Sequence, residues 1–320
     1  MCIRDRLRIS LFLLAILTAV TGFVQTFPQL LIVRFLQGMI IPASLTAVMA
    51  FLAQPGRPNI NLQRGMSLYV AATISGGFLG RFLAGVCSAF IHWQTFFYLL
   101  AAVLVFCSYM IQPQEVTRST VRKSTPLDRP LAALAVIRPC VPVYLAIFLL
   151  FFVFCGTLNF LPFRTMELAG TSSGLLAGAM YCGYVTGIVT SMGAGRIIGL
   201  AGSEARVMIG AYLLFVTALA GMLIPHTVLL FVMLFPFCGA MFLVHCVATA
   251  VVNSRGEGNR GVASALYVSS YYSGGVLGSY FPGFIFNEHG WGAMVTVLAG
   301  VALLGVALLT AFFRTTSPKK

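Results

Sequence analysis

The sequence predicts an all-α protein that crosses a membrane many times. Of its 320 residues, 59% are hydrophobic and only 8% are charged, whereas about a quarter of the residues of a water-soluble domain are charged. The apolar residues also gather in stretches of about 20, the length of helix that crosses the hydrocarbon layer of a bilayer. Helices are expected because a helix satisfies its own backbone hydrogen bonds where water is absent.

Ten apolar stretches qualify as membrane-spanning helices. The first, 9–25, begins with a basic segment, as a signal peptide does, but no cleavage site of small residues follows it and nine more spans do. The other nine lie at 28–52, 66–90, 94–111, 140–162, 173–195, 207–224, 227–252, 262–286 and 291–313.

The positive charges indicate how the spans are oriented. Twenty Lys and Arg against seven Asp and Glu give a net charge of +13. A nucleic-acid-binding protein would cluster such charge on a polar face, but here it lies in short loops between the spans. Cytoplasmic loops are enriched in Lys and Arg, so both termini are expected in the cytoplasm. Arg164 then falls outside, and Arg34 and Arg81 lie within spans.

The chain contains an internal repeat at an offset of 198 residues. Tyr69 matches Tyr267, and Trp93 matches Trp291. Such aromatic matches at one offset favour duplication over a chance likeness of glycine-rich spans. The offset joins the third span to the ninth, so six spans form one unit and both copies have the same orientation. The other matches are Leu68, Val70, Ser75, Gly76, Gly77, Leu79, Gly80 and Gly85 with Leu266, Val268, Ser273, Gly274, Gly275, Leu277, Gly278 and Gly283.

Ten spans then divide into two bundles. We expect residues 1–111 to form a partial N-terminal bundle of four spans, 112–139 a basic cytoplasmic linker, and 140–320 a C-terminal bundle of six spans. The first of two six-helix bundles would thus lack its two N-terminal helices, which predicts an N-terminal truncation. Whether residues 1–6 are native stays open.

Polar residues are spread unevenly over the spans. The first, fourth, seventh and tenth spans carry no charged residue, Asn or His, so they are expected to face lipid. The other spans carry the polar side chains and are expected to enclose a wetted interior. The candidate cavity residues are Arg34, Gln37, Asn159, His245, Tyr271 and Tyr272, with Arg81 as a further charge on the third span.

These features resemble the major facilitator superfamily. Leu31, Arg34, Gln37 and Gly38 match that family's fourth-helix signature, a leucine followed by R-x-x-Q-G. The resemblance covers essentially the whole chain. It implies two six-helix bundles around a cavity that opens alternately to each side, with helices 3 to 12 present here, and it places Arg34, Asn159 and His245 on cavity-lining helices.

Shorter segments are similar to bacterial drug:proton antiporters and sugar-efflux-like permeases. These segments are NFLPFR at 159–164, the intramembrane His245, and LYVSSYYSGG at 266–275. Other family motifs are incomplete, because Gly199 replaces the acid of the second cytoplasmic gate motif and the antiporter motif at 72–77 lacks its proline. The resemblance implies a multi-pass protein of the bacterial inner membrane that exchanges a small molecule for protons.

Arg34 permits two interpretations. It either lines the cavity, where it would hold an anionic substrate group or bias a proton site, or extends to the outer membrane surface. A central Arg costs about 2.5–3.5 kcal/mol on insertion scales, and its repeat partner Met233 is uncharged, so the fold alone does not require it. Arg81 either pairs with a polar group or fixes packing. Asn159 either contacts substrate or caps the end of its span.

His245 is the candidate for proton coupling. Histidine titrates near neutral pH, and no Asp or Glu lies within any of the ten predicted spans. The alternative is a structural histidine that bonds a neighbouring helix. Arg34, the pair Arg164 and Glu167 at the outer mouth, or an acid on helices absent from this sequence are further candidates for the coupling.

Eight glycines are spaced to let helices approach closely, which usually means packing. The resemblance places their helices at the seam between the two bundles. These glycines are Gly76, Gly77, Gly80, Gly183, Gly187, Gly274, Gly275 and Gly278.

The sequence does not predict an enzyme. Residues 170–174 fit the G-x-S-x-G motif of serine hydrolases, but that motif needs a strand–turn–helix setting, whereas here it precedes a predicted span. No P-loop, H-E-x-x-H or C-x-x-C pattern is present, so neither a cofactor nor a metal is expected.

We therefore predict a secondary active transporter that carries a small molecule by alternating access, with proton-coupled efflux. It would act as a monomer in the lipid bilayer, without a nucleic-acid partner. The alternative is an inactive fragment or a non-transporting membrane protein, such as a sensor or scaffold. The substrate, the direction of transport and the coupling ion stay open.

Overall fold

A computed structural model describes residues 3–52, 62–111, 138–170, 173–255 and 260–316, and every regular element in these ranges is a helix. Eight of the helices are long and apolar enough to cross a membrane. The all-helical, multi-pass fold class is therefore confirmed for these ranges. The count of ten spans stays a prediction, and the predicted linker 112–139 lies almost wholly outside the described residues.

The contacts within the chain divide it into two units. Unit 1 comprises residues 1–73 and 79–124, and unit 2 comprises 74–78 and 125–320. Unit 1 holds α1 (Ile3–Thr21), α2 (Phe27–Leu52), α4 (Trp93–Met110) and most of α3 (Leu62–Phe90). Unit 2 holds η1 (Arg138–Cys140), α6 (Val141–Ala169), α7 (Gly174–Ala179), η2 (Met180–Gly183), α8 (Tyr184–Ala201), α9 (Glu204–Gly221), α10 (Thr227–Arg255), α11 (Arg260–Tyr280) and α12 (Pro282–Thr316).

In unit 1, α1 packs against both α2 and α4. Polar side chains connect these helices. Ser44 of α2 donates a hydrogen bond to the hydroxyl of Ser10 at 2.9 Å, and Ser108 of α4 donates to the carbonyl of Arg8 at 2.9 Å. Small hydroxyl residues of this kind join helices in membranes, where the hydrophobic effect gives no driving force between helices and packing and hydrogen bonds supply it instead.

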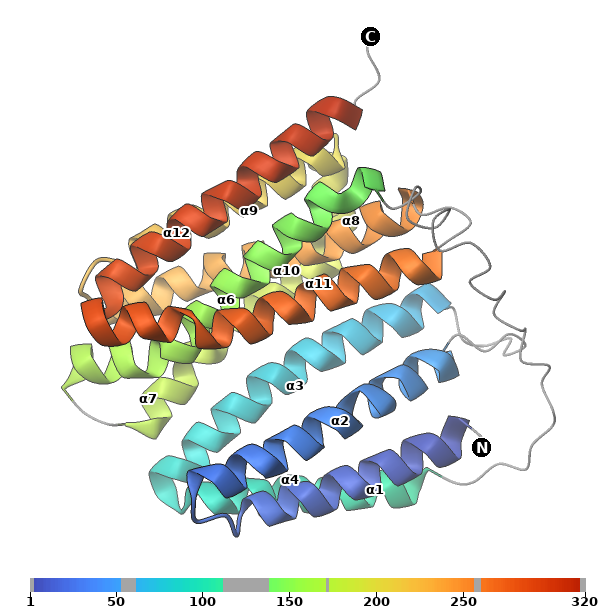
Figure 1. Ribbon diagram of the computed structural model, residues 1–320, viewed down its shortest axis with the longest axis vertical. Coiled ribbons are helices and arrows are strands. Elements are labelled where there is room, and N and C mark those ends of the chain that lie inside the picture. Colours follow the sequence, from blue (N-terminus) through green and yellow to red (C-terminus); the bar gives the residue numbers. More distant parts are fainter. Residues whose placement is uncertain (1–2, 53–61, 112–137, 171–172, 256–259, 317–320) are drawn as a thin grey trace. The chain divides into compact units, whose positions relative to one another are not determined.

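In unit 2, α6 packs against α11 and α12, while α10 packs against α8 and α9; Figure 1 shows α6 and α11 side by side. The core is aromatic. Phe215 of α9 stacks on Phe237 of α10 with ring centroids 4.3 Å apart. The fully buried Tyr212 of α9 donates to the carbonyl of Ala146 on α6 at 3.0 Å, so its hydroxyl is satisfied inside the core.

The helix pairings of unit 1 recur in unit 2. As α1 contacts α2 and α4, so α9 contacts α10 and α12, which is the correspondence that the sequence repeat predicts. Trp93 and Trp291 differ in their surroundings. Trp291 is 3% exposed and bonds the carbonyl of Met222, whereas Trp93 is 43% exposed and packs edge-on against Phe97.

Several helix ends differ from the predicted span ends, and two of these differences have a physical reason. The fifth span was expected to end at 162, but α6 continues through Pro162 to Ala169 and is capped by Gly170, whose φ is 64°. Hydropathy follows the thickness of the bilayer rather than the length of the helix, so it misses a helix that extends beyond the apolar layer. The ninth span was expected to reach 286, but α11 ends at Tyr280 and α12 starts at Pro282, at the first helical position, where proline is favoured.

Candidate functional site

A polar cluster in unit 2 surrounds His245 of α10. Tyr267 of α11 places its hydroxyl oxygen 2.8 Å from Nδ1 of His245 and donates to the backbone carbonyl of the same histidine at 3.0 Å. Tyr271, one turn further along α11, lies with its ring centroid 4.6 Å from that of the imidazole. The histidine is half-buried, and its ring is held by two residues of one neighbouring helix.

Aromatic rings extend this cluster to a third helix. Tyr271 stacks on Phe151 of α6 with centroids 3.7 Å apart. Tyr272 lies edge-on to Tyr271 at 5.3 Å and is 53% exposed. The cluster therefore joins α6, α10 and α11 through contacts of histidine, tyrosine and phenylalanine.

A second cluster, in unit 1, surrounds Arg34 of α2. Nη1 of Arg34 donates to Oε1 of Gln37 at 3.0 Å, and its guanidinium lies 5.2 Å from the ring centroid of Phe97 on α4. Gln37 is 5% exposed and donates through Nε2 to the hydroxyls of Thr18 and Thr21 on α1, both at 3.3 Å. Arg34 and Gln37 are three positions apart, so they share one face of the helix.

The two threonines fix the orientation of the Gln37 amide. Thr18 donates its own proton to the carbonyl of Leu14, and Thr21 donates to that of Leu17. Each hydroxyl has one proton, so both can only accept from Gln37. The amide nitrogen of Gln37 must then face α1 and its oxygen must face Arg34. The R-x-x-Q spacing thus places a buried acceptor beside the cation.

Arg164 and Glu167 lie on the last two turns of α6. Nη1 of Arg164 and Oε2 of Glu167 are 2.9 Å apart, the arginine side chain is 10% exposed and the glutamate side chain is 61% exposed. Nε of Arg164 is buried without a hydrogen-bond partner among the described residues. Asn159 is exposed and lies ten positions before the helix ends, so it does not cap the end of α6.

Five of the eight predicted packing glycines lie against other helices of unit 2. A Cβ atom on Gly274 or Gly278 would overlap the backbone carbonyl of Phe148 or Phe152 on α6. Gly275 lies against the Phe151 ring; Gly183 and Gly187 face Leu234 and Phe242 of α10. On α3 lie Gly76, Gly77 and Gly80, together with Arg81. A position between the two bundles stays a prediction for all eight glycines.

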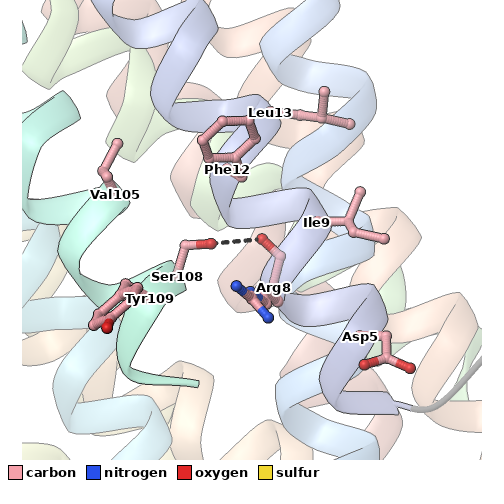
Figure 2. A pocket seen from close by; sticks show the side chains of 8 residues that line it. All are labelled: Asp5, Arg8, Ile9, Phe12, Leu13, Val105, Ser108 and Tyr109. Atoms are coloured by element: carbon pink, nitrogen blue, oxygen red, sulfur yellow. Dashed lines mark hydrogen bonds between the residues drawn. The ribbon is translucent and has the colours of Figure 1, made fainter. Parts of the chain in front are cut away.

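A hollow of about 490 Å³ lies between α1 and α4 in unit 1 (Figure 2). None of the six predicted cavity residues lines it. Its walls are mostly apolar, with Arg8 and Tyr109 near the Ser108 hydrogen bond drawn in the figure. Its lining residues are Asp5, Arg8, Ile9, Phe12, Leu13, Val105, Ser108 and Tyr109. In the ranges that the structure describes, no three His, Cys, Asp or Glu side chains come together as metal ligands.

Sequence reasoning singled out His245, Tyr271, Arg34 and Gln37, which the structure places in these two clusters, but not all of the residues that they contact. It did not single out Tyr267, although Tyr267 and Tyr271 are four positions apart and so share a helix face. The contacts of Thr18, Thr21 and Phe151 depend on how separate helices pack, and no local sequence pattern reports that.

Taken together, the apolar helices of the two units, with polar clusters inside each unit, are typical of a protein that crosses a membrane several times. The family model of the Major Facilitator Superfamily matches residues 4–279. The chain belongs to this superfamily, whose members are transporters.

Relatives and solved structures agree with this assignment. The chain is 25% identical over 316 residues to the inner membrane transport protein YnfM of Escherichia coli, covering 92% of this chain and 72% of that protein. It is 22% identical over 310 residues to the uncharacterised MFS-type transporter YybF of Bacillus subtilis, covering 93% and 73%.

Two solved structures share the fold. The human organic anion transporter MFSD10 has a TM-score of 0.67 and 22% identity, covering 96% of this chain and 77% of that one. The D323A mutant of the nucleoside transporter NupG has a TM-score of 0.70 and 14% identity, covering 99% and 84%.

Proposed function

We propose that this protein exports a small molecule that carries an anionic group, in exchange for protons, by alternating access in a bacterial inner membrane with both termini in the cytoplasm. The observation that carries the proposal is the sign of the fixed charge: the ten predicted spans contain Arg34 and Arg81 but no Asp or Glu. A cation at membrane depth marks a functional site, because it is costly to insert.

The geometry of Arg34 supports binding of an anion. Gln37 accepts from one end of the guanidinium, and a guanidinium offers five N–H donors in a fork that suits a carboxylate or phosphate. Arg34 is an exposed side chain, which leaves its remaining donors accessible. The name of the structural neighbour MFSD10, an organic anion transporter, agrees with this class of substrate.

The cluster around His245 supports proton exchange, because histidine is the side chain whose ordinary pKa lies nearest to neutral pH. The membrane potential also favours export of an anion in exchange for protons. Exchange of one internal monoanion for one external proton moves two charges down an inside-negative potential, which contributes about 4.6 kcal/mol per 100 mV. We assign substrate contact to Arg34, Gln37, Tyr271, Tyr272 and Asn159, and proton exchange to His245. A single copy of the chain would suffice for this cycle.

Purified protein in proteoliposomes tests the proposal. Carboxyfluorescein serves as a membrane-impermeant anion, and ethidium and glucose serve as a cation and a neutral sugar. An acid interior should drive uptake of the anion, because protons leave as the anion enters. Uptake that ignores the pH gradient would contradict proton exchange, uptake of ethidium alone would contradict the anionic class, and transport of none of the three would favour a non-transporting protein.

Arg34 has a matched control in the same assay. Arg34→Ala should abolish anion uptake without loss of membrane insertion, while Arg314→Ala, in the last turn of α12, should leave uptake unchanged. Normal uptake by Arg34→Ala would remove this residue from the site.

A further inference from the structure

The hydroxyl of Tyr267 makes two short contacts with a single residue, His245. Its oxygen lies 2.8 Å from Nδ1 and 3.0 Å from the backbone carbonyl oxygen. A tyrosine hydroxyl has one proton to donate, and its oxygen can accept one as well. The direction of that one proton therefore determines which ring nitrogen of the histidine carries hydrogen.

Only one arrangement places a proton in both contacts. If the hydroxyl proton pointed at Nδ1, the two oxygen atoms would face each other at 3.0 Å with no proton between them, which is repulsive. If the proton points at the carbonyl oxygen, Nδ1 must supply the proton of the other contact. The neutral imidazole that satisfies both contacts carries its proton on Nδ1.

We propose that Tyr267 is a positioning residue that holds neutral His245 with its proton on Nδ1 and leaves Nε2 as the basic nitrogen. The hydrogen bond at one ring nitrogen sets the state of the other. A histidine side chain in water prefers the opposite form, with the proton on Nε2, so the tyrosine acts against the intrinsic preference.

The surroundings hold this arrangement in place. Tyr267 is 3% exposed, so water does not compete for its hydroxyl. Thr249 donates to the same carbonyl of His245 at 2.8 Å, and the ring of Tyr271 limits rotation of the imidazole. The titratable groups that face the imidazole from α11 are the hydroxyls of Tyr267 and Tyr271, both uncharged near neutral pH.

Nε2 is therefore the atom through which His245 acts. Among the described residues no hydrogen bond is made to Nε2, and the ring is only half-buried. This nitrogen can accept a proton, or a hydrogen bond from a substrate. Its part in proton exchange rests on the proposed function, whereas the form of the ring does not.

Nitrogen-15 NMR of the full chain in liposomes tests the ring form directly. The chain has four histidines, so the background H92Q, H226N and H289Q leaves His245 as the one labelled imidazole. At a pH where this ring is neutral, Nδ1 should show the signal of a protonated nitrogen and Nε2 that of an unprotonated one. Tyr267→Phe should shift most of the population to the form protonated on Nε2.

Tyr181→Phe is the matched control. Tyr181 is 8% exposed and its hydroxyl donates to the carbonyl of Leu158 at 3.0 Å, so this variant also loses one buried tyrosine hydrogen bond but should leave the spectrum of His245 unchanged. Neutral His245 protonated on Nε2 in the parent protein overturns the proposal, whether or not Tyr267→Phe folds. A His245→Gln variant with unchanged pH dependence of transport would remove only the role in coupling.

Discussion

Trp291 of α12 donates its indole N–H to the carbonyl oxygen of Met222, the residue that follows α9, at 2.9 Å. Both residues are buried. The last carbonyls of a helix have no partner within the helix, so this indole satisfies a group that would otherwise be buried without one. The bond fixes α12 against the end of α9.

Trp291→Phe should therefore lower the free energy of unfolding by about 1 kcal/mol or more, because it leaves the carbonyl of Met222 unpaired. Thermal unfolding in detergent measures the loss. The repeat partner Trp93 is 43% exposed, and Trp93→Phe should change stability by no more than about 0.5 kcal/mol. Equal losses in both variants would argue against a specific role for the indole bond.

Gly278→Ala should destabilise unit 2 by about 1–3 kcal/mol, because the added methyl group meets backbone rather than a flexible side chain. A Cβ at this position would overlap the carbonyl of Phe152. Gly210→Ala is the control, since a Cβ there meets nothing within 4 Å, and alanine at a helical position should stabilise by up to about 1 kcal/mol. Size-exclusion profiles after heating compare the two. An unchanged profile for Gly278→Ala would show that α6 and α11 can separate slightly.

Alanine substitutions at Gly290 and Gly292 test the cost of backbone strain without any steric overlap. Neither glycine has an atom within 4 Å of the position of an added Cβ, but Gly290 has φ 77° and ψ −174°. An L-residue in that region costs about 1–3 kcal/mol. Gly290→Ala should lower the melting temperature and Gly292→Ala should not. Equal melting temperatures for the two variants would show that the non-helical backbone conformation of Gly290 within α12 is not needed for the fold.

Arg34 and Gln37 should be energetically coupled. Loss of Gln37 leaves the guanidinium without its acceptor, so Gln37→Leu and Arg34→Leu together should cost less than the sum of the single changes, by about 0.5–3 kcal/mol. Thermal unfolding of the parent protein, the two single variants and the double variant measures this difference. The pair Gln37→Leu and Arg196→Leu, which belong to different units and share no hydrogen bond among the described residues, should be additive to within about 0.5 kcal/mol. Additive effects for Arg34 and Gln37 would show that their hydrogen bond does not contribute to stability.

The orientation predicted from the loop charges has an independent test. A fluorescent protein fused after Lys320 should fold and fluoresce in the cytoplasm, while alkaline phosphatase fused there should be inactive, because it needs the oxidising outer compartment. The opposite pair of results would invert the topology. The cations of the loops would then not determine orientation in this protein.

Composition and hydropathy were sufficient to predict the helical class, because a bilayer leaves the backbone no other common way to satisfy its polar groups. They located the long described helices, although several helix ends differ from the predicted span ends by six residues or more. The differences at the ends of α6 and α11 have a physical reason. Residues 163–169 are too polar to count as membrane, yet they continue a helix beyond the apolar stretch, and a new helix begins at Pro282 inside an apolar stretch.

The residues of the candidate site could also be predicted only in part. An intramembrane histidine and an intramembrane arginine are conspicuous in any sequence, so His245 and Arg34 were singled out as candidates. Tyr267 was not, because tyrosine is common in membrane helices and nothing local marks the one whose hydroxyl reaches a ring nitrogen. The residues that Gly274 and Gly278 contact could not be predicted from the sequence either, since the contact with α6 joins positions more than 100 residues apart.

Because backbone meets backbone where Gly274 and Gly278 lie against α6, no flexible side chain separates α6 from α11 at these two positions. The ring of His245 on α10 is joined to α11 by the Tyr267 hydroxyl alone among its described side-chain hydrogen bonds. A displacement of α10 away from α11 by about 1 Å breaks a bond of this length. In the proposed ring form, such a step would uncover the proton on Nδ1.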